Sequence, residues 1–312
     1  MLFIIYINDL PSVVDPESRI FLFADDTKVY RRIRTQQDVK QLQEDLQALQ
    51  KWSDKWLLKF HPDKCVTMRV GKTTMQRPNY TMGSENEHML KETIAEKDIG
   101  VTFEKNLTFD KHMQEKINKA NRIMGIIRKT FEFLDEEIFK CLFKSLVRPI
   151  VEYANQVWCP YHRKHIESLE NIQRRATKVI PGMKNLSYPE RLQKLGLPTL
   201  AYRRARGDMI EVFKLLNDNG GYDKNTTEGL MKTSTNTSTR GHKYKLETQR
   251  ARLDLRKYSF SVRVVAAWNS LPENVACASS INSFKRKLDS FWEKQRIKFD
   301  HTESLTTQLW KS

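Results

Sequence analysis

Two adjacent aspartates, Asp25 and Asp26, are the residues of this sequence best suited to chemistry. Neighbouring carboxylates repel each other, and a cation or a base relieves that repulsion. The apolar residues 20–23 precede them and predict a strand buried on both faces. Carboxylates at the end of such a strand suit a hard ion such as Mg²⁺, which takes oxygen ligands. On this pattern alone, the two aspartates could equally belong to an ordinary hairpin turn, because aspartate is a common turn residue.

Short strands and one long helix are predicted around the two aspartates. Residues 20–23 and 27–31 form the two arms of a hairpin. Apolar residues at helical spacing over 36–56 predict an amphipathic helix. The apolar segment 2–10, which ends at Pro11, predicts a short buried helix. Further strands are expected at residues 65–70, around Tyr80 and at 99–103.

The apolar period becomes helical after residue 110. An apolar stripe over 112–127 predicts one helix, and further helices are expected at 135–147 (ending before Pro149), 166–180 and 200–216. Trp158 and Trp268 are interpreted as core anchors of their helices rather than as rings that stack on bases. Residues 217–242 are rich in Asn, Thr, Ser and Gly, which predicts a flexible linker. A small basic helical module is expected at 253–271 and 279–296.

The net charge of +16 is distributed unevenly. The first 100 residues contain 15 Lys and Arg and 15 Asp and Glu, so the whole excess follows residue 100. Such an excess indicates a polyanionic partner, most simply nucleic acid, because solubility alone would not separate the bases so sharply. The residues expected to follow backbone phosphates are Lys116, Lys119, Arg122, Arg174, Arg175 and Lys178, with an ordinary solvated face as the alternative.

The cysteines and the apolar start of the chain indicate an intracellular, reduced protein without a membrane partner. The four cysteines occur singly, which favours neither a disulfide framework nor a four-cysteine zinc site. Cys159, His162 and His165 have a zinc-knuckle spacing, but no fourth ligand is obvious, so coincidence is the preferred interpretation. The opening apolar run is too short to span a membrane and has no basic leader or cleavage site.

An ordered series of segments resembles the reverse transcriptases of non-LTR (LINE, jockey-type) retrotransposons. Phe23-Ala24-Asp25-Asp26 is similar to the Tyr/Phe-Ala-Asp-Asp box, motif C of the polymerase palm. Residues 2–11 look like the helix after motif B, and residues 56–65 resemble motif D with His61 in place of the usual Asn. The other similar segments are 99–112 (motif E, the primer grip), 147–154, Trp158 and 173–176 on the thumb side, and 256–265, 268–272 and 282–285 near the C-terminus.

This resemblance implies an α+β fold and a polymerase mechanism. The implied parts are a partial palm (1–110), a helical thumb-like domain (111–216), a flexible linker (217–250), a basic helical C-terminal module (251–300) and a tail (301–312). The family is expected in the nucleus and the cytoplasm. It copies an RNA template into DNA from a DNA primer at a nicked chromosomal target, using deoxynucleotides and two Mg²⁺ ions. The resemblance implies Asp25 as a metal ligand, and Asp26 less firmly, because adjacent strand residues face opposite ways. Lys64 is implied as proton donor to pyrophosphate; without the family match it would be a solvated lysine.

The resemblance also implies parts that this sequence lacks. The motif A aspartate, the motif B loop, the fingers and any endonuclease domain would lie before Met1, so we expect a C-terminal fragment with an incomplete second metal site. Asp26 cannot replace the motif A carboxylate, because it is fixed to the same strand end as Asp25. We therefore expect that this chain alone does not polymerise. The alternative function is that of a non-catalytic nucleic-acid-binding protein, either a decayed copy or a retained fragment.

Overall fold

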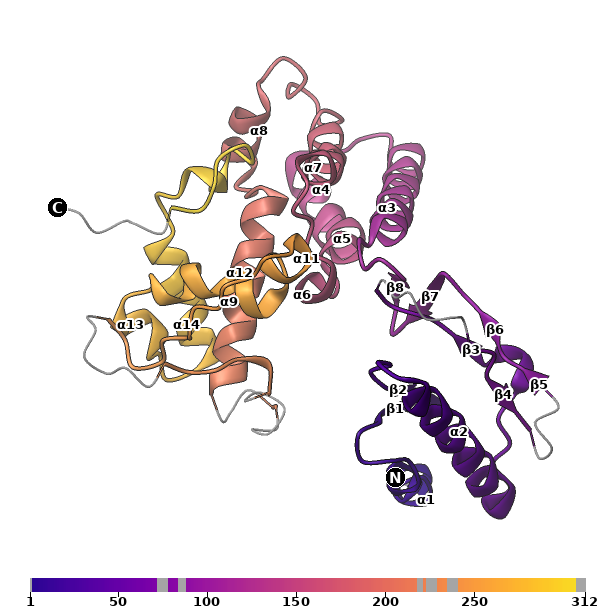
Figure 1. The fold of residues 1–312 in the computed structure, drawn as a ribbon. Coiled ribbons are helices and arrows are strands. Elements are labelled where there is room, and N and C mark those ends of the chain that lie inside the picture. Colours follow the sequence, from indigo (N-terminus) through magenta and orange to yellow (C-terminus); the bar gives the residue numbers. More distant parts are fainter. Residues whose placement is uncertain are drawn as a thin grey trace. The chain divides into compact units, whose positions relative to one another are not determined.

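The computed structural model describes residues 2–71, 78–83, 88–217, 221–222, 229–234 and 241–306. The chain divides into two compact units, Met1–Leu107 and Thr108–Ser312 (Figure 1). The named strands of the described residues belong to the first unit, and the second unit is helical. The fold therefore mixes α and β structure, as expected. In the described ranges no helix is long and apolar enough to cross a lipid bilayer.

The first unit combines small two-stranded sheets with one long helix. β1 (Arg19–Phe23) and β2 (Asp26–Tyr30) form an antiparallel hairpin, and so do β7 (Ala95–Asp98) and β8 (Val101–Glu104). The strand expected at 65–70 is limited to two residues, which pair in parallel with β6. The remaining elements are α1 (Leu2–Tyr6), η1 (Leu10–Val13), α2 (Gln36–Trp56), η2 (Pro62–Lys64), β3 (Val66–Thr67), β4 (Thr81–Met82), β5 (His88–Met89) and β6 (Lys91–Glu92).

Helix α2 is the frame of the first unit and spans the predicted residues 36–56. It begins at a capping box, in which the side chains of Thr35 and Asp38 each accept a hydrogen bond from the other residue's backbone N–H. Leu49 and Trp52 on its buried face pack against Leu10 in one apolar cluster. Burial of this stripe, rather than helix propensity alone, stabilises the helix.

Helix α1 forms where the apolar run predicts a helix, but the expectation that it is buried is wrong. The side chains of Phe3, Ile4, Ile5 and Tyr6 are 40% to 69% exposed. A helix of five residues makes little more than one turn. Tyr6 packs edge-on against Trp56 of α2, with ring centroids 5.5 Å apart. The other apolar contacts with α2 come from the residues that follow α1, starting at Ile7.

The second unit contains the predicted helices. The helices expected over 112–127, 166–180 and 200–216 are found, with shifts of a few residues, as α3 (Asp110–Thr130), α7 (Arg163–Thr177) and α9 (Leu200–Leu216). The other elements are α4 (Glu136–Leu142), a π-helical turn η3 (Phe143–Val147), α5 (Arg148–Glu152), α6 (Asn155–Trp158), α8 (Tyr188–Leu195), α11 (Asp254–Lys257), α12 (Phe260–Asn269), α13 (Glu273–Ala276), α14 (Ile281–Phe291) and η5 (Arg296–Lys298).

One expected helix boundary is wrong. The helix predicted to end before Pro149 continues through α4, η3 and α5 to residue 152. Pro149 is the second residue of α5 and has no N–H to donate to the preceding turn. The π-helical turn directly before it, with Phe143 and Val147 buried, lets the chain pass the proline ring without ending the helix.

Helix α9 lies at the centre of the second unit (Figure 1). It contacts α6 and α7 from the earlier part of the chain, and α12 and α14 from the later part. Trp268 of α12 and Phe284 of α14 are fully buried, in the same apolar core as Met209 and Phe213 of α9. The helices expected to form a C-terminal module thus share one core with α9. A pair of short helices has too little apolar surface to close a core without such a partner.

Part of the expected linker over 217–250 lies outside the described residues. In the described part, Met231, His242 and Leu246 are buried, and Thr233 forms a β-bridge with Leu246. His242 Nε2 lies 3.1 Å from the backbone oxygen of Trp268. These residues therefore contribute to the core around α12.

A buried carboxylate joins α7 to the start of α9. Glu170 is inaccessible to solvent, and both its oxygens accept hydrogen bonds from the backbone N–H of Leu200 at 3.1 Å, while one accepts from Ala201 at 3.3 Å. The hydroxyl of Tyr188 donates to the same carboxylate at 2.6 Å. The first N–H groups of a helix have no helical partner, so a negative charge there is favourable. Glu170 therefore fixes α9 relative to α7.

Candidate functional site

Asp25 and Asp26 lie at the tip of the hairpin formed by β1 and β2. Phe23 pairs with Asp26, so Ala24 and Asp25 are the two central residues of the turn. Ala24 has a φ of 51°, in the left-handed region that favours glycine. Both aspartates are exposed to solvent. The predicted hairpin is confirmed, with Asp26 as the first residue of β2 rather than as part of the turn.

One face of the hairpin is packed against α2. Ile20 and Leu22 of β1 and Val29 of β2 contact the apolar cluster around Leu49 and Trp52. Ile20 pairs directly with Val29, so these side chains share one face of the two-stranded sheet. This packing determines where the tip of the hairpin lies within the first unit.

Polar contacts hold both ends of the hairpin. Ser18, just before β1, donates its hydroxyl hydrogen bond to the buried carboxylate of Asp45 on α2. Arg31, directly after β2, lies 2.7 Å from Asp15 and 3.6 Å from Asp38 of the α2 capping box. The pKa of the Asp15 carboxyl is lowered, chiefly by the hydrogen bond from Arg31. The hairpin that carries the aspartates is thus tied to α2 by an apolar face and by charged groups.

The other face of the hairpin is exposed, and the expectation of a strand buried on both faces is wrong. Phe21 and Phe23 are 51% and 56% exposed, and β1 alternates between exposed and half-buried residues. Phe21 stacks on the exposed ring of Tyr30, with centroids 5.8 Å apart. Successive residues of a strand face opposite sides, and only Ile20 and Leu22 face α2. Four apolar residues in a row therefore do not require two covered faces.

The charged groups near the tip include one cation on the same face as Asp26. Lys28 follows Asp26 by two residues on β2, and its ammonium lies 2.6 Å from Asp98 Oδ2 of β7. This ion pair joins the hairpin to the second hairpin, β7–β8. Both side chains are partly exposed, so the pair contributes little to stability.

The described residues fit one part of a two-ion site. Asp25 and Asp26 supply carboxylate oxygens, which hard divalent ions prefer. Within the described part of the chain, however, no group of three His, Cys, Asp or Glu side chains could hold a metal ion. Lys64 lies exposed in η2, and no side-chain hydrogen bond or ion pair of the described residues joins it to either aspartate.

The basic residues predicted on α3 and α7 differ in their surroundings. Lys119 and Arg122 of α3 and Lys178 at the end of α7 are exposed. Lys116 is half-buried. Arg175 is exposed and donates a hydrogen bond from Nη2 to Asn121 Oδ1 of α3 at 3.0 Å, so the two basic helices lie side by side. Together, these side chains place positive charge on adjacent helices.

Arg174 is the exception among the predicted basic residues. Its guanidinium donates to Asn171 at 2.8 Å and to Glu167 at 3.3 Å, and it lies over the ring of Tyr188. Nη2 also lies 3.1 Å from His301 Nε2. With these neighbours, Arg174 is engaged mainly with other residues of the second unit.

The spacing of Cys159, His162 and His165 does not produce a metal site within the described residues. His165 Nε2 lies 2.7 Å from Asp110 Oδ1 of α3. Burial lowers the pKa of His165 and raises that of the Cys159 thiol, which keeps both groups neutral at pH 7.

Sequence reasoning missed two features of the second unit. Tyr161 and Tyr258 stack with centroids 4.4 Å apart and rings 7° from parallel. Arg263 of α12 forms a buried ion pair with Asp208 of α9 at 3.0 Å. In both cases the partners come from distant parts of the chain, and no local pattern of residue types signals the pairing.

Curated relatives match just over half of the chain. It is 24% identical over 192 residues, 58% of its length, to an RNA-directed DNA polymerase from mobile element jockey of Drosophila melanogaster. It is 26% identical over 183 residues to the jockey polymerase of Drosophila funebris, and 24% identical over 196 residues to a probable RNA-directed DNA polymerase from transposon X-element of Drosophila melanogaster. The matched part covers about 20% of each relative.

Other comparisons add no further relatives. No protein-family model matches the sequence, and no solved structure matches it. The homologues of the chain are thus the RNA-directed DNA polymerases of jockey and related non-LTR retrotransposons.

Proposed function

We propose, on the premise of this homology, that the chain is part of an RNA-directed DNA polymerase of a non-LTR retrotransposon. The observation that supports the proposal most is the position of Asp25 and Asp26 at the tip of a tight β-hairpin, within a box similar to motif C of reverse transcriptases. In this proposal the first unit is the C-terminal portion of the palm domain, and the helices after residue 107 form a thumb-like domain. The complete enzyme copies element RNA into DNA from a primer at a nicked nuclear target.

The hairpin has the features that such a role requires. Its apolar face and the contacts of Ser18 and Arg31 hold the tip in place, so the carboxylates of Asp25 and Asp26 need little ordering before they bind. These two side chains would hold a divalent ion, and in the parent enzyme two such ions activate the primer hydroxyl and hold the triphosphate. The described residues lack a third ligand, so we assign no complete reaction to this chain. Lys64 remains the proposed proton donor to pyrophosphate.

The helical unit would hold the template–primer duplex. Lys119 and Arg122 lie on α3, Arg175 lies on the adjacent α7, and Lys178 follows the last residue of α7. Cations along two neighbouring helices can neutralise successive phosphates of a duplex and release its counterions. The excess of Lys and Arg after residue 100 supports the same role.

Primer extension tests the catalytic part of the proposal. The purified chain is incubated with an RNA template, a DNA primer, deoxynucleotides and either Mg²⁺ or Mn²⁺. We expect no template-dependent synthesis by this chain alone. Synthesis that disappears in Asp25→Asn would overturn that expectation and assign the reaction to the hairpin. Binding of Mn²⁺, followed by water proton relaxation, should be weak and should decrease further when both aspartates are replaced by asparagine.

A second candidate function is non-catalytic binding of nucleic acid. The observation that favours it is the lack of a three-ligand group among the described residues, beside helices rich in cations. The reading frame before the codon of Met1 separates the two candidates. An in-frame motif A and motif B favour the polymerase, whereas stop codons there favour a binding protein or a decayed copy. Both candidates predict affinity for an RNA–DNA hybrid that weakens steeply with salt, and a chain that binds no hybrid at low salt would exclude both.

A further inference from the structure

We propose that the rings of Tyr161, His162 and Tyr258 form a stacking platform for an unpaired base of single-stranded nucleic acid. The inference rests on the proposed function, because it assumes a nucleic-acid partner, and it adds a second site with its own ligand. The platform lies in the second unit, where α11 meets the segment before α7.

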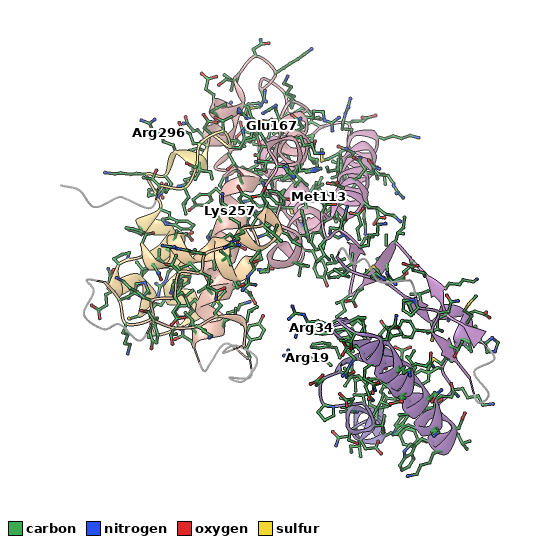
Figure 2. The ribbon with its side chains drawn as sticks, in the orientation of Figure 1. Arg19, Arg34, Met113, Glu167, Lys257 and Arg296 are labelled. Carbon is green, nitrogen blue, oxygen red and sulfur yellow. The ribbon has the colours of Figure 1, made fainter. Side chains whose placement is uncertain are left out.

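The three rings form one pile. Tyr161 is in the middle, with its centroid 4.4 Å from that of Tyr258 and 4.2 Å from that of His162. The ring planes of the two tyrosines differ by 7°, and those of Tyr161 and His162 by 38°. His162 is exposed, and the ring of His165 lies 6.0 Å from it with its plane tilted by 57°, so His165 does not stack flat on His162. The exposed imidazole can therefore take a further flat ring. Next to the other end, the ammonium of Lys257 lies 5.3 Å from the centroid of Tyr258. Figure 2 labels Lys257 among the side chains of the second unit.

A buried ion pair holds the pile in place. Arg263 donates a hydrogen bond to the backbone oxygen of Tyr258 at 3.2 Å and another to the backbone oxygen of Asn155 at 3.2 Å. The same guanidinium forms two hydrogen bonds of 3.0 Å with the carboxylate of Asp208. The two chain segments that carry the rings are thus fixed by one network. A platform that is already ordered loses little conformational entropy when a ligand binds.

The surface around the pile is basic. Arg163 and Lys164 follow His162 directly, and Arg256 and Lys257 precede Tyr258; all four are exposed. The carboxylates nearby are Asp110, which lies against His165, and Asp254. Four cations within two residues of the pile favour a ligand with negative charge on both sides of a flat ring. A nucleotide within a strand, with a phosphate on each side of its base, has that chemistry.

The geometry favours a single strand over a duplex. In a duplex, each base is already stacked between its neighbours and presents only its edges. In a single strand, the face of a base is available to an aromatic side chain, and such stacking tolerates any sequence. We therefore expect the pile to take a base without sequence preference, and the four cations to contact the flanking phosphates.

The test is fluorescence anisotropy with the full chain and a labelled oligothymidylate of about 12 nucleotides, with an RNA–DNA hybrid as second ligand. His162→Ala and Tyr258→Leu should each weaken binding of the single strand by about fivefold or more, and leave hybrid binding unchanged within about twofold. Tyr258→Phe, which keeps the ring, should retain the affinity. Phe133→Leu is the matched control, because it removes another exposed aromatic ring of the second unit.

The outcomes separate the two proposals. If both ring variants bind the single strand as tightly as the unaltered chain, with circular dichroism showing that they are folded, the platform is wrong and the hybrid site stands. If the unaltered chain binds the hybrid but not the single strand, the platform is also wrong. If it binds neither ligand, the proposed function fails together with the platform.

Discussion

Arg263 on α12 holds Asp208 on α9 by two hydrogen bonds, from Nε to Oδ2 and from Nη2 to Oδ1, each 3.0 Å long. The side chains are 14% and 8% exposed. Burial raises the pKa of Asp208, and the charge of Arg263 opposes that shift. Asn155 donates a third hydrogen bond to this carboxylate at 2.9 Å. The pair therefore places a cation beside a buried carboxylate at the contact between α9 and α12.

Removal of Arg263 should be strongly destabilising. Arg263→Met leaves the Asp208 carboxylate buried without its cation, and we expect a loss of about 3–5 kcal/mol in the free energy of unfolding. Urea denaturation followed by circular dichroism measures it. The control is Arg206→Met, because Arg206 of α9 forms an ion pair with Asp289, whose side chain is 47% exposed. We expect this variant to lose about 1 kcal/mol in the free energy of unfolding. Equal losses in the two variants would contradict the importance of burial.

The turn at the hairpin tip should tolerate glycine and resist a β-branched residue. Ala24 has a φ of 51°, which costs an L-residue about 1 kcal/mol and which Val adopts still less readily. We expect Ala24→Val to destabilise the chain by about 1 kcal/mol or more, and Ala24→Gly to leave stability unchanged or slightly increased. Thermal unfolding of both variants tests this prediction. A Val variant as stable as the Gly variant would show that the turn does not hold the left-handed conformation.

The capping box of α2 predicts a pH dependence of stability. The pKa of Asp38 is lowered from 3.8 to about 2, first by the backbone N–H of Arg34 and then by that of Thr35. A carboxyl group whose pKa is lower in the folded than in the unfolded chain stabilises the folded state. This stabilisation is fully present at pH values above the pKa of the unfolded chain. That contribution is lost as the pH falls from about 4 to about 2. Asp38→Asn should therefore be less stable at pH 7, and its deficit should shrink through this window.

Denaturant unfolding at several pH values measures the effect of Asp38. The two stability curves should converge as the solution becomes more acidic. Curves that stay parallel from neutral pH to pH 2 would show that the Asp38 carboxylate is not held by these N–H groups.

The basic residues of α3 and α7 should determine the salt dependence of hybrid binding. Each phosphate contact that is lost reduces the slope of log affinity against log salt by about 0.9. We expect a variant with glutamine at Lys119, Arg122, Arg175 and Lys178 to bind an RNA–DNA hybrid more weakly, with a slope reduced by about 2–4. The control has glutamine at Lys40, Lys51, Lys55 and Lys59, which are exposed on α2 or just after it and give the same change in net charge. If the slope of log affinity against log salt decreases equally in the control, net charge rather than this surface determines the salt dependence.

The sequence predicts the long helices well, for identifiable reasons. The helices over 36–56 and 200–216 agree with α2 and α9 at both ends, because Thr35 and Thr199 cap their first turns and apolar residues recur at helical spacing. The hairpin is also found where the residue types place it. These signals are local, so a single sequence contains them.

Burial and long-range contacts were not predictable in the same way. Residues 20–23 are apolar at every position, so their pattern does not tell which face of the strand is buried. In the structure, only the face with Ile20 and Leu22 packs against α2. The stack of Tyr161 on Tyr258 and the pairing of Asp208 with Arg263 join residues that no spacing rule connects. The roles of Asp25, Asp26 and Lys64 came from the family resemblance and remain proposals.

The carboxylate of Glu170 beneath the start of α9 has a consequence for amide hydrogen exchange. Backbone amides in the first turn of a helix usually exchange quickly with water, because they have no helical acceptor. Those of Leu200 and Ala201 instead donate to a carboxylate that solvent does not reach. In deuterated water these two amides should keep their protons for as long as the middle of the helix, and the fraying expected at a helix end should be missing from this one.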